Sequence, residues 1–484
     1  MDRIALKNIT KVISLIGMFI ALFFAIPVMV GIFENENVTD FMLFDIGLFV
    51  IFLLMYVVMI HHNVQMRIKG AILTVNLIWL LLGVAGAIPF VLSTHVSFAS
   101  GFFEAISGFT TTGATVYSDI EALPKHILLL RSMMHWLGGI GIIVLGVGLF
   151  SIINPTGSMA LFKAESTGVK LDKVTAKIKD TAIKIWGVYI LLTVVDTLLL
   201  WAEGMSLFDA INHAFSTMST GGFSTKNASM AYWADNPMIL WTTTFFMIVA
   251  GINFLAHFKV VRGDFSGYKT EETKWYLIIF FVVSILLTYY HVSHSSDDIF
   301  YSATHAFFSV ASVLTTTGFV SVDYERWGVG AIVLIMFVML IGGSAGSTAG
   351  GFKVSRYVVL IKNLFHQIKK LLHPKAISTL YIDGNKITFD TLGIISGFAL
   401  LYAISNLVLT AILFMQGYDF MTSFSAALAI IGNIGPGFAR VGPVDNYQFF
   451  SDFDKIVMSF FMILGRLEFY TMIMLLSKSF WKKF

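Results

Sequence analysis

Long apolar stretches recur along the whole chain and are separated by short polar segments. A helix needs about 20 mostly apolar residues to cross a bilayer. Roughly ten stretches are long enough, at residues 11–33, 41–61, 70–94, 127–152, 183–203, 237–258, 274–291, 329–350, 390–416 and 453–477. The pattern therefore predicts a multi-pass membrane protein built from helices.

Four shorter apolar segments lie between successive stretches, at residues 97–110, 207–219, 298–315 and 419–432. They are too short to cross a bilayer. Each leads into a short run that closes on glycine: Ser107–Gly113, Ser216–Gly221, Ser312–Gly318 and Ile430–Gly435. We interpret these segments as re-entrant pore helices, each followed by a short extended strand.

The order span, pore helix, glycine turn, span occurs four times, at a period of roughly 100 to 120 residues. Irregular backbone at membrane depth is tolerated where it lines a watery cavity, so we expect four units around one pore inside the monomer. The predicted fold class is an all-α polytopic membrane protein of about ten transmembrane helices. The expected divisions are 1–68 for two extra N-terminal helices, then 69–178, 179–272, 273–385 and 386–484 for the four pore repeats.

The glycine turns indicate the chemistry of this pore. Glycine adopts backbone dihedrals that other residues avoid, so consecutive carbonyl oxygens can face a shared axis and replace the hydration shell of a cation. The predicted ligands are Thr111, Thr112, Gly113, Ser219, Thr220, Gly221, Thr316, Thr317, Gly318, Asn433, Ile434 and Gly435. Ile434 has no hydroxyl, which favours coordination by backbone carbonyls. Individual threonine hydroxyls can instead cap helices or satisfy backbone groups.

Composition agrees with a membrane-embedded chain and narrows its function. Hydrophobic residues make up 57% of the 484 residues and charged residues 13%, with a mean hydropathy of +0.81. The net charge of +3 is small and gives no indication of a nucleic-acid partner. The absence of cysteine excludes disulfides and thiolate chemistry.

Charge is sorted between the two sides of the predicted spans. Basic residues gather in the N-terminal segment, at 163–179, at 353–375 and at the C-terminal end. By the positive-inside rule, both termini and these loops are expected to be cytoplasmic. The opposite loops carry Glu34, Glu36, Asp119, Asp235, Asp297, Asp298, Asp323 and Asp445. Two interpretations are open: these acids concentrate cations at an outer vestibule, or they only solvate their loops.

A glycine-rich run interrupts the apolar stretch after the third glycine turn. It consists of Gly342, Gly343, Ser344, Ala345, Gly346, Ser347, Thr348, Ala349, Gly350 and Gly351. Glycine costs a helix about 1 kcal/mol per residue, so we expect an unwound loop in the membrane. The loop could act as a movable gate, which its hydroxyl groups favour, or it could allow close helix packing through small residues.

Arg466 lies within the last apolar stretch, where a charge is costly unless it faces water or a partner. It could repel cations from the pore, or it could pair with Glu468 or a loop carbonyl. Arg131, His135, Asn253 and His257 are expected to serve packing.

No enzyme is predicted, because the chain carries no metalloprotease motif, nucleophile elbow or Walker sequence. Two further alternatives remain open. A proton- or sodium-coupled transporter would need a titrating acid in the membrane, for which Glu104, Asp196 and Glu468 are candidates. A weakly selective monovalent cation pathway would need no such acid.

Several sequence motifs together resemble one family. They are SGFTTTGAT at 107–115, HWLGGIGI at 135–142, STGGFST at 219–225, TTTGF at 315–319, GGSAGSTAGGFK at 342–353, GNIGPGF at 432–438 and GRLE at 465–468. With the two extra N-terminal spans, the chain resembles the TrkH and TrkG branch of the Trk/Ktr/HKT potassium transporter superfamily over essentially its whole length.

The resemblance implies a potassium uptake protein of the bacterial inner membrane, with potassium at the filter and no bound cofactor. It implies that Gly342–Gly351 and Arg466 gate the pore, and that glycine rather than serine at position 113 favours potassium. It also implies a homodimer, and a cytosolic TrkA-type regulatory ring that binds NAD(H) or ATP/ADP.

Overall fold

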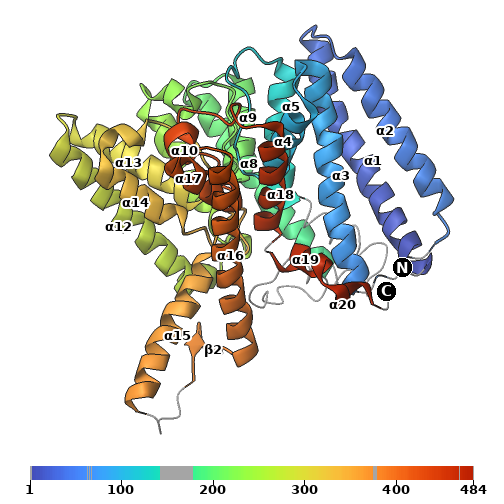
Figure 1. The fold of residues 1–484 in the computed structure, drawn as a ribbon. Coiled ribbons are helices and arrows are strands. Elements are labelled where there is room, and N and C mark those ends of the chain that lie inside the picture. The colour runs from blue at the N-terminus through green and yellow to red at the C-terminus, as the bar shows by residue number, and fades with distance from the viewer. Residues whose placement is uncertain are drawn as a thin grey trace.

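The computed structural model describes residues 3–62, 64, 66, 68–141, 178–373, 379–467 and 469–482, and these residues are almost entirely helical (Figure 1). The predicted all-α membrane fold is confirmed. Parts of the predicted span 127–152 and of the basic loop 163–179 lie outside the described residues, as do Lys375 and Glu468.

Within the described residues, six helices are long and apolar enough to cross a membrane. They are α1 (Arg3–Phe33), α2 (Thr39–Val58), α3 (Ile68–Thr94), α8 (Ile178–Ala202), α12 (Glu271–His294) and α16 (Phe389–Met415). Large apolar side chains on their outer faces, such as Leu198, Phe281 and Leu407, are exposed. Such faces are stable in lipid and costly in water.

The four predicted pore helices are present as α4 (Phe98–Phe109), α9 (Leu207–Met218), α13 (Ile299–Leu314) and α17 (Phe420–Ile431). Each begins at a residue whose side-chain oxygen accepts a hydrogen bond from a backbone N–H of the first turn: Ser97, Ser206, Asp298 and Asp419. Serine and aspartate are preferred N-caps because they satisfy an otherwise unpaired donor. Each pore helix therefore has a start encoded in its own sequence.

The helix after the pore segment is interrupted in the second and fourth units, which corrects the continuous spans predicted at 237–258 and 453–477. In the second unit, α10 (Pro237–Ala250) and α11 (Phe254–Val261) meet at an angle of 99°. In the fourth unit, α18 (Asp452–Arg466) is followed by the short helix α19 (Tyr470–Ile473). In the first unit, α5 (Lys125–Trp136) passes into the π-helix η1 (Leu137–Gly141).

In the third unit, α14 (Val329–Met339) ends before the glycine-rich run, and α15 (Val354–Leu372) begins after it. The predicted unwound loop is therefore present, and residues 341–353 contain no helix. Helix α15 and the antiparallel strands β1 (Tyr381–Ile382) and β2 (Asn385–Lys386) project from one end of the molecule (Figure 1). Short helical turns complete the fold: η2 (Ser229–Trp233), η3 (Phe265–Lys269), η4 (Tyr324–Trp327), η5 (Ala439–Val441), η6 (Met474–Leu476) and α20 (Lys478–Trp481).

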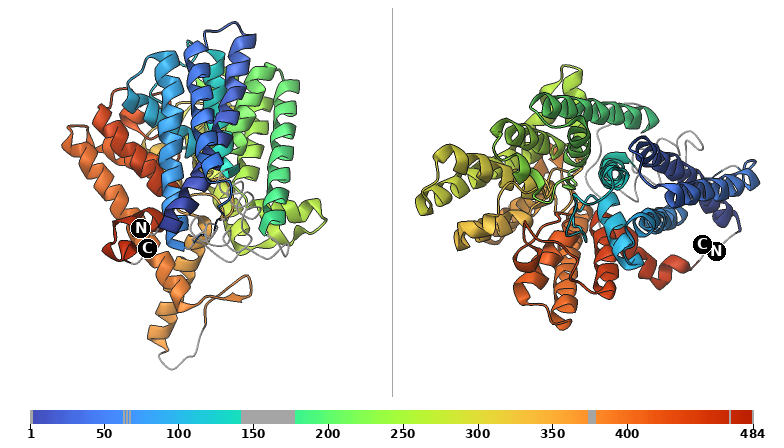
Figure 2. Two further views of the ribbon diagram at one scale, coloured as in Figure 1. Left: turned by 90° about the vertical axis from the view of Figure 1, so that its right-hand side faces the viewer. Right: turned by 90° about the horizontal axis from the view of Figure 1, so that it is seen from above.

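Packing between the units closes a ring. Within each unit, the long helix packs on its own pore helix, as in the pairs α3 with α4, α8 with α9, α12 with α13 and α16 with α17. Between units, α5 packs on α9, α10 on α13, α15 on α16, and α18 on α4. The last of these contacts joins the fourth unit to the first, and the view from above shows the units around a common centre (Figure 2, right). Helices α1 and α2 lie outside this ring, where α1 contacts α3 and α5.

Candidate functional site

A short non-helical strand follows each pore helix and has the same backbone path in all four units. The first residue after the helix cap has a left-handed φ of 55°, 54°, 56° and 53° at Thr111, Thr220, Thr316 and Asn433, respectively. Two residues later, φ is again positive, at 79°, 81°, 82° and 96° for Gly113, Gly222, Gly318 and Gly435. Left-handed non-glycine residues are uncommon and are concentrated at functional sites, so four equivalent cases make these strands the candidate site.

This geometry corrects the register predicted for the second strand. The left-handed glycine there is Gly222 rather than Gly221. The matching triplet is therefore Thr220, Gly221 and Gly222, and Ser219 is the residue that caps α9. The sequence contains two adjacent glycines at this point, and only the backbone dihedrals distinguish them.

The four strands contact one another in sequence order around a closed ring. A β-carbon at Gly113 would overlap the carbonyl oxygen of Gly221, and one at Gly222 would overlap that of Thr317. A β-carbon at Gly318 would overlap the carbonyl oxygen of Ile434, and one at Gly435 would lie 2.6 Å from that of Thr112. Each glycine thus makes room for a carbonyl of the next strand, and the fourth strand returns to the first.

The carbonyl oxygens of the strands are available to a ligand. Among the described residues, hydrogen-bond donors reach none of the backbone oxygens of Thr111–Gly113, Thr220–Gly222, Thr316–Gly318, Asn433 and Ile434. Backbone oxygens buried without a partner are rare. These strands therefore present several unsatisfied oxygens towards a narrow ring, as a filter for a bare cation requires.

Most side-chain hydroxyls of the strands are already engaged. Thr112 Oγ1 lies 2.7 Å from Thr110 Oγ1 and accepts a hydrogen bond from Asn433 Nδ2 at 2.9 Å. Thr317 Oγ1 lies 2.7 Å from Thr315 Oγ1, and Thr220 Oγ1 donates to the carbonyl of Ser219. These contacts leave the backbone oxygens as the more accessible ligands.

The fourth strand differs from the others at its outer end. The hydroxyl of Tyr447 donates a hydrogen bond of 2.8 Å to the carbonyl oxygen of Gly435. The backbone N–H of Tyr447 donates to the carbonyl of Thr115, also at 2.8 Å. Tyr447 thereby ties the fourth strand to the first, a role that nothing in the local sequence pattern indicates.

Pore helices add electrostatic attraction for a cation. The C-terminal end of each pore helix directly precedes its strand. That end of a helix carries the equivalent of about half a negative charge, from carbonyls without an intrahelical partner. Four such ends at one ring favour a cation and disfavour an anion.

The glycine-rich loop lies directly against the ends of the strands that follow the pore helices. The backbone N–H of Gly350 donates to Thr316 Oγ1 at 2.7 Å. Thr348 Oγ1 lies 3.1 Å from the carbonyl of Met218 and 3.2 Å from that of Ala250. A β-carbon at Gly350 would lie 2.5 Å from the carbonyl oxygen of Gly432, at the start of the fourth strand. The loop therefore contacts the second, third and fourth units.

Arg466 connects the same loop to the first unit. Its Nη1 donates to the carbonyl of Thr348 at 2.9 Å, and its Nη2 donates to the carbonyls of Gly138 and Gly139 at 2.7 and 3.0 Å. The guanidinium thus joins the end of α18, the loop and the π-helix η1. Of the predicted alternatives, the one in which Arg466 holds a loop carbonyl describes this geometry.

Glu272 is a residue of this region that the sequence analysis did not identify. Its Oε1 accepts hydrogen bonds from the N–H groups of Ala345 at 2.6 Å and Ser355 at 3.2 Å, so it holds both ends of the loop. The signal in the sequence is a second acid in the first turn of an apolar span, Glu271-Glu272, which ordinary helix capping also explains.

The other predicted residues have structural contacts. Asn253 caps α11, and His257 bonds the carbonyl of Val249 at 2.8 Å. Among the described residues, no group of three or more histidine, aspartate and glutamate side chains could hold a metal ion. The oxygen-lined ring of strands is accordingly the candidate cation site.

Comparisons with known proteins agree with this architecture. A family model described as a cation transport protein, TrkH, matches residues 37–483. The Trk system potassium uptake protein TrkH of Vibrio parahaemolyticus is 36% identical over 432 residues, covering 87% of this chain and 88% of that protein. TrkI of Halomonas elongata, another Trk system potassium uptake protein, is 31% identical over 481 residues and covers 98% and 97% of the two chains.

Among solved structures, the crystal structure of the potassium transporter TrkH from Vibrio parahaemolyticus superposes with a TM-score of 0.88 at 31% identity. The match covers 99% of this chain and 100% of that one. Full-length similarity in sequence and in fold leads to one conclusion: the chain belongs to the TrkH family of cation transport proteins.

Proposed function

We propose that this protein takes up potassium ions across the bacterial inner membrane, through the ring of four strands. The observation that carries the proposal is the closed ring of strands at the ends of four pore helices, whose carbonyl oxygens, except that of Gly435, accept no hydrogen bond from the described residues. Oxygens arranged in this way replace the hydration shell of a potassium ion. The names of the relatives, which are potassium uptake proteins, support the choice of potassium.

The proposed ligands are the backbone oxygens of Thr111–Gly113, Thr220–Gly222, Thr316–Gly318 and Asn433–Gly435. Potassium is the transported ion, and the chain needs no resident cofactor in this proposal. Strands of different sequence give a less regular ring than identical subunits would, so the preference for potassium over sodium is moderate.

The loop Gly342–Gly351 is proposed to be the gate. Its position at the ends of the strands that follow the pore helices supports this role, as do its hydrogen bonds to the second, third and fourth units. Arg466, which makes the bond from the fourth unit, also bonds the first unit. Opening would require these hydrogen bonds to break at the same time. A cytosolic event that pulls on α15, which continues directly from the loop, could supply that movement.

In this proposal both termini are cytoplasmic and the protein forms a homodimer. A cytosolic regulator of the TrkA type, which binds nucleotides, controls it. Support for a partner at α15 comes from its exposed apolar side chains, among them Leu364, Phe365 and Leu371, in a helix that also carries Lys369 and Lys370. An apolar stripe flanked by basic residues on a projecting helix suits a protein partner.

Ion-coupled transport is the second candidate. Glu104 is unsuited to proton coupling because it forms an ion pair with Arg131. Asp196 in α8 keeps this candidate open, since its side chain is fully buried and neither carboxylate oxygen has a hydrogen-bond partner among the described residues. An acid in that setting is a candidate for carrying a proton.

Flux measurements in liposomes separate the two candidates. The purified protein is reconstituted, and rubidium or potassium uptake is compared with sodium uptake under an imposed voltage, with and without a proton gradient. Voltage-driven uptake that prefers potassium and ignores the proton gradient supports the channel. Uptake that follows the proton gradient, and loses this dependence in Asp196→Asn, would establish coupling instead.

A further inference from the structure

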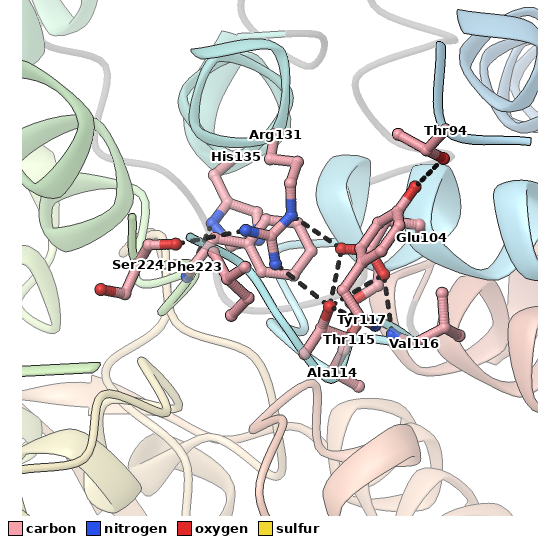
Figure 3. Close-up of polar contacts among 12 residues, drawn as sticks. Thr94, Glu104, Ala114, Thr115, Val116, Tyr117, Arg131, His135, Phe223 and Ser224 are labelled. Carbon is pink, nitrogen blue, oxygen red and sulfur yellow. Dashed lines mark hydrogen bonds and ion pairs between the residues drawn. The ribbon is translucent and has the colours of Figure 1, made fainter. Parts of the chain in front are cut away.

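A buried ion pair lies beside the residues that follow the first and second strands (Figure 3). Glu104 on the pore helix α4 and Arg131 on α5 are joined by a contact of 2.8 Å between Oε1 and Nε. Their side chains are 0% and 1% exposed. A fully buried pair is costly to desolvate and by itself adds little stability. Its other contacts therefore indicate its role.

Glu104 holds the outer end of the first strand. Its carboxylate accepts hydrogen bonds from Thr115 Oγ1 at 3.0 and 3.2 Å and from the backbone N–H of Val116 at 3.0 Å. Thr115 lies two residues beyond Gly113. The carboxylate therefore fixes the chain immediately after the left-handed glycine.

Arg131 extends the same network to the second strand. Its Nη1 donates to the carbonyl of Ser224 at 3.2 Å, and its Nη2 donates to Thr115 Oγ1 at 3.2 Å. The guanidinium also lies 4.0 Å from the centre of the Phe223 ring. Ser224 is two residues beyond Gly222, as Thr115 is beyond Gly113. One guanidinium thus contacts equivalent positions of neighbouring strands (Figure 3).

The pair is particular to the first unit. Counted seven residues before the first left-handed residue of each strand, the equivalents of Glu104 are His213, Ser309 and Ala426. His213 bonds Ser224 Oγ at 2.9 Å within its own unit. The fourfold architecture therefore does not require a carboxylate at this position, and the pair serves the junction between the first two strands.

We propose that Glu104 and Arg131 are positioning residues that set the spacing of the first and second strands, and so the preference for potassium over sodium. The inference rests on the proposed function. Rings of oxygens distinguish these ions through the number and geometry of the ligands. An ion pair that holds two strands at once restricts that geometry, while the ligands themselves remain the carbonyl oxygens.

The test is the permeability ratio of Glu104→Gln, taken from the reversal potential in liposomes with potassium and sodium on opposite sides. The amide can still accept from Thr115 or Val116, but it no longer forms an ion pair. We expect the potassium-to-sodium ratio to fall by about tenfold. A fall in the number of folded molecules would lower the current and leave the reversal potential unchanged.

Glu34→Gln is the matched control, because it removes the exposed ion pair between Glu34 and Lys125, which also has a contact of 2.8 Å. Its ratio should equal that of the unmodified protein. Should Glu104→Gln fail to assemble, Thr115→Val keeps the ion pair but removes the hydroxyl that both residues contact. A smaller fall in the ratio is expected there, and an unchanged ratio would overturn the proposal.

Gly113→Ser in the same assay distinguishes this inference from the proposed function. If Gly113→Ser lowers the ratio and Glu104→Gln leaves it unchanged, the positioning role is wrong and the filter assignment stands. If neither substitution changes the ratio, the filter assignment itself is wrong and the positioning role falls with it.

Discussion

The candidate cation site contains several residues with a left-handed backbone conformation. Gly113 is the most informative of them, because its missing side chain leaves space for the carbonyl oxygen of Gly221 on the next strand. At a φ of 79° a non-glycine residue is also strained. Any side chain here must therefore displace a proposed ligand of the ion.

We predict that Gly113→Ser lowers the potassium-to-sodium permeability ratio by roughly tenfold, equivalent to about 1.4 kcal/mol. Reversal potentials in liposomes measure this ratio. Gly187→Ser serves as the control, since a β-carbon at Gly187 would meet no atom of the described residues within 4 Å. Equal ratios for Gly113→Ser and the unmodified protein would mean that the first strand is not part of the filter.

Residue types alone predicted these strands well but could not fix their register. The Thr-Thr-Gly runs located the first and third strands, because glycine is the usual left-handed residue. The Thr-Gly-Gly run of the second strand contains two glycines, and the left-handed one is Gly222. Left-handed Thr111, Thr220 and Thr316 could not be predicted, since threonine is β-branched and disfavours this conformation.

At the scale of elements, the loop Gly342–Gly351 contacts the interrupted helices around it. Glycine content predicted the loop, because a run of glycines weakens a helix. The break between α10 and α11 has no such signal, and the carbonyl of Gly251 at this break accepts a hydrogen bond from Ser344 of the loop at 2.9 Å. A contact between segments this far apart in the chain is invisible to local sequence patterns.

A single substitution of Arg466 removes three hydrogen bonds of this region at once. These bonds join the loop to the π-helix of the first unit. We predict that Arg466→Ala increases rubidium flux by roughly tenfold, because a hydrogen bond from a charged group contributes about 1.5 kcal/mol or more and about 1.4 kcal/mol corresponds to a factor of ten.

The flux of Arg466→Ala is measured per reconstituted protein, together with the permeability ratio. The ratio should stay constant, because the strands themselves are unchanged. Arg262→Ala is the control, since Arg262 is exposed beyond the end of α11. An unchanged or lower flux in Arg466→Ala would mean that these hydrogen bonds do not hold the pathway closed.

At the scale of the whole molecule, one chain builds a ring that other proteins could build from four identical subunits. Hydropathy and the repeated glycine turns predicted this plan, because spans and turns are local features. The differences between the units were not predictable in the same way. The hydrogen bonds from Tyr447 to Thr115 and from Arg131 to Ser224 join different units and have no counterpart in a local sequence pattern.

The charge distribution of the molecule is also asymmetric, and acidic side chains gather at the mouth of the ring that we propose to be external. Glu325 and Asp445 both face Gly442 there, and Glu325 accepts a hydrogen bond from the N–H of Ala439 at 2.8 Å. A cavity of about 460 Å³ lies beside them, lined by Ala439, Arg440, Asp445, Asn446 and Phe449. Acids at a pore mouth raise the local concentration of cations.

Burial raises the pKa of Glu325, and the charges of Asp323 and Asp445 raise it further. Burial, followed by the charge of Asp323, likewise raises the pKa of Asp445. Carboxyl groups with raised pKa values take up protons at a higher pH than ordinary acids do, so these two lose their negative charge first as the external pH falls. We therefore predict that external acidification raises the apparent KM for potassium while the maximal flux stays constant.

The measurement is rubidium uptake at several external pH values and low ionic strength, where attraction by surface charge is least screened. The double variant Glu325→Gln with Asp445→Asn should show a raised KM already at neutral pH and a flatter dependence on pH. Asp264→Asn is the control, because this acid lies in the loop between α11 and α12, on the opposite side of the predicted membrane. If the double variant keeps the full pH dependence, the groups that titrate lie elsewhere, and Asp196 in the membrane becomes the residue to test.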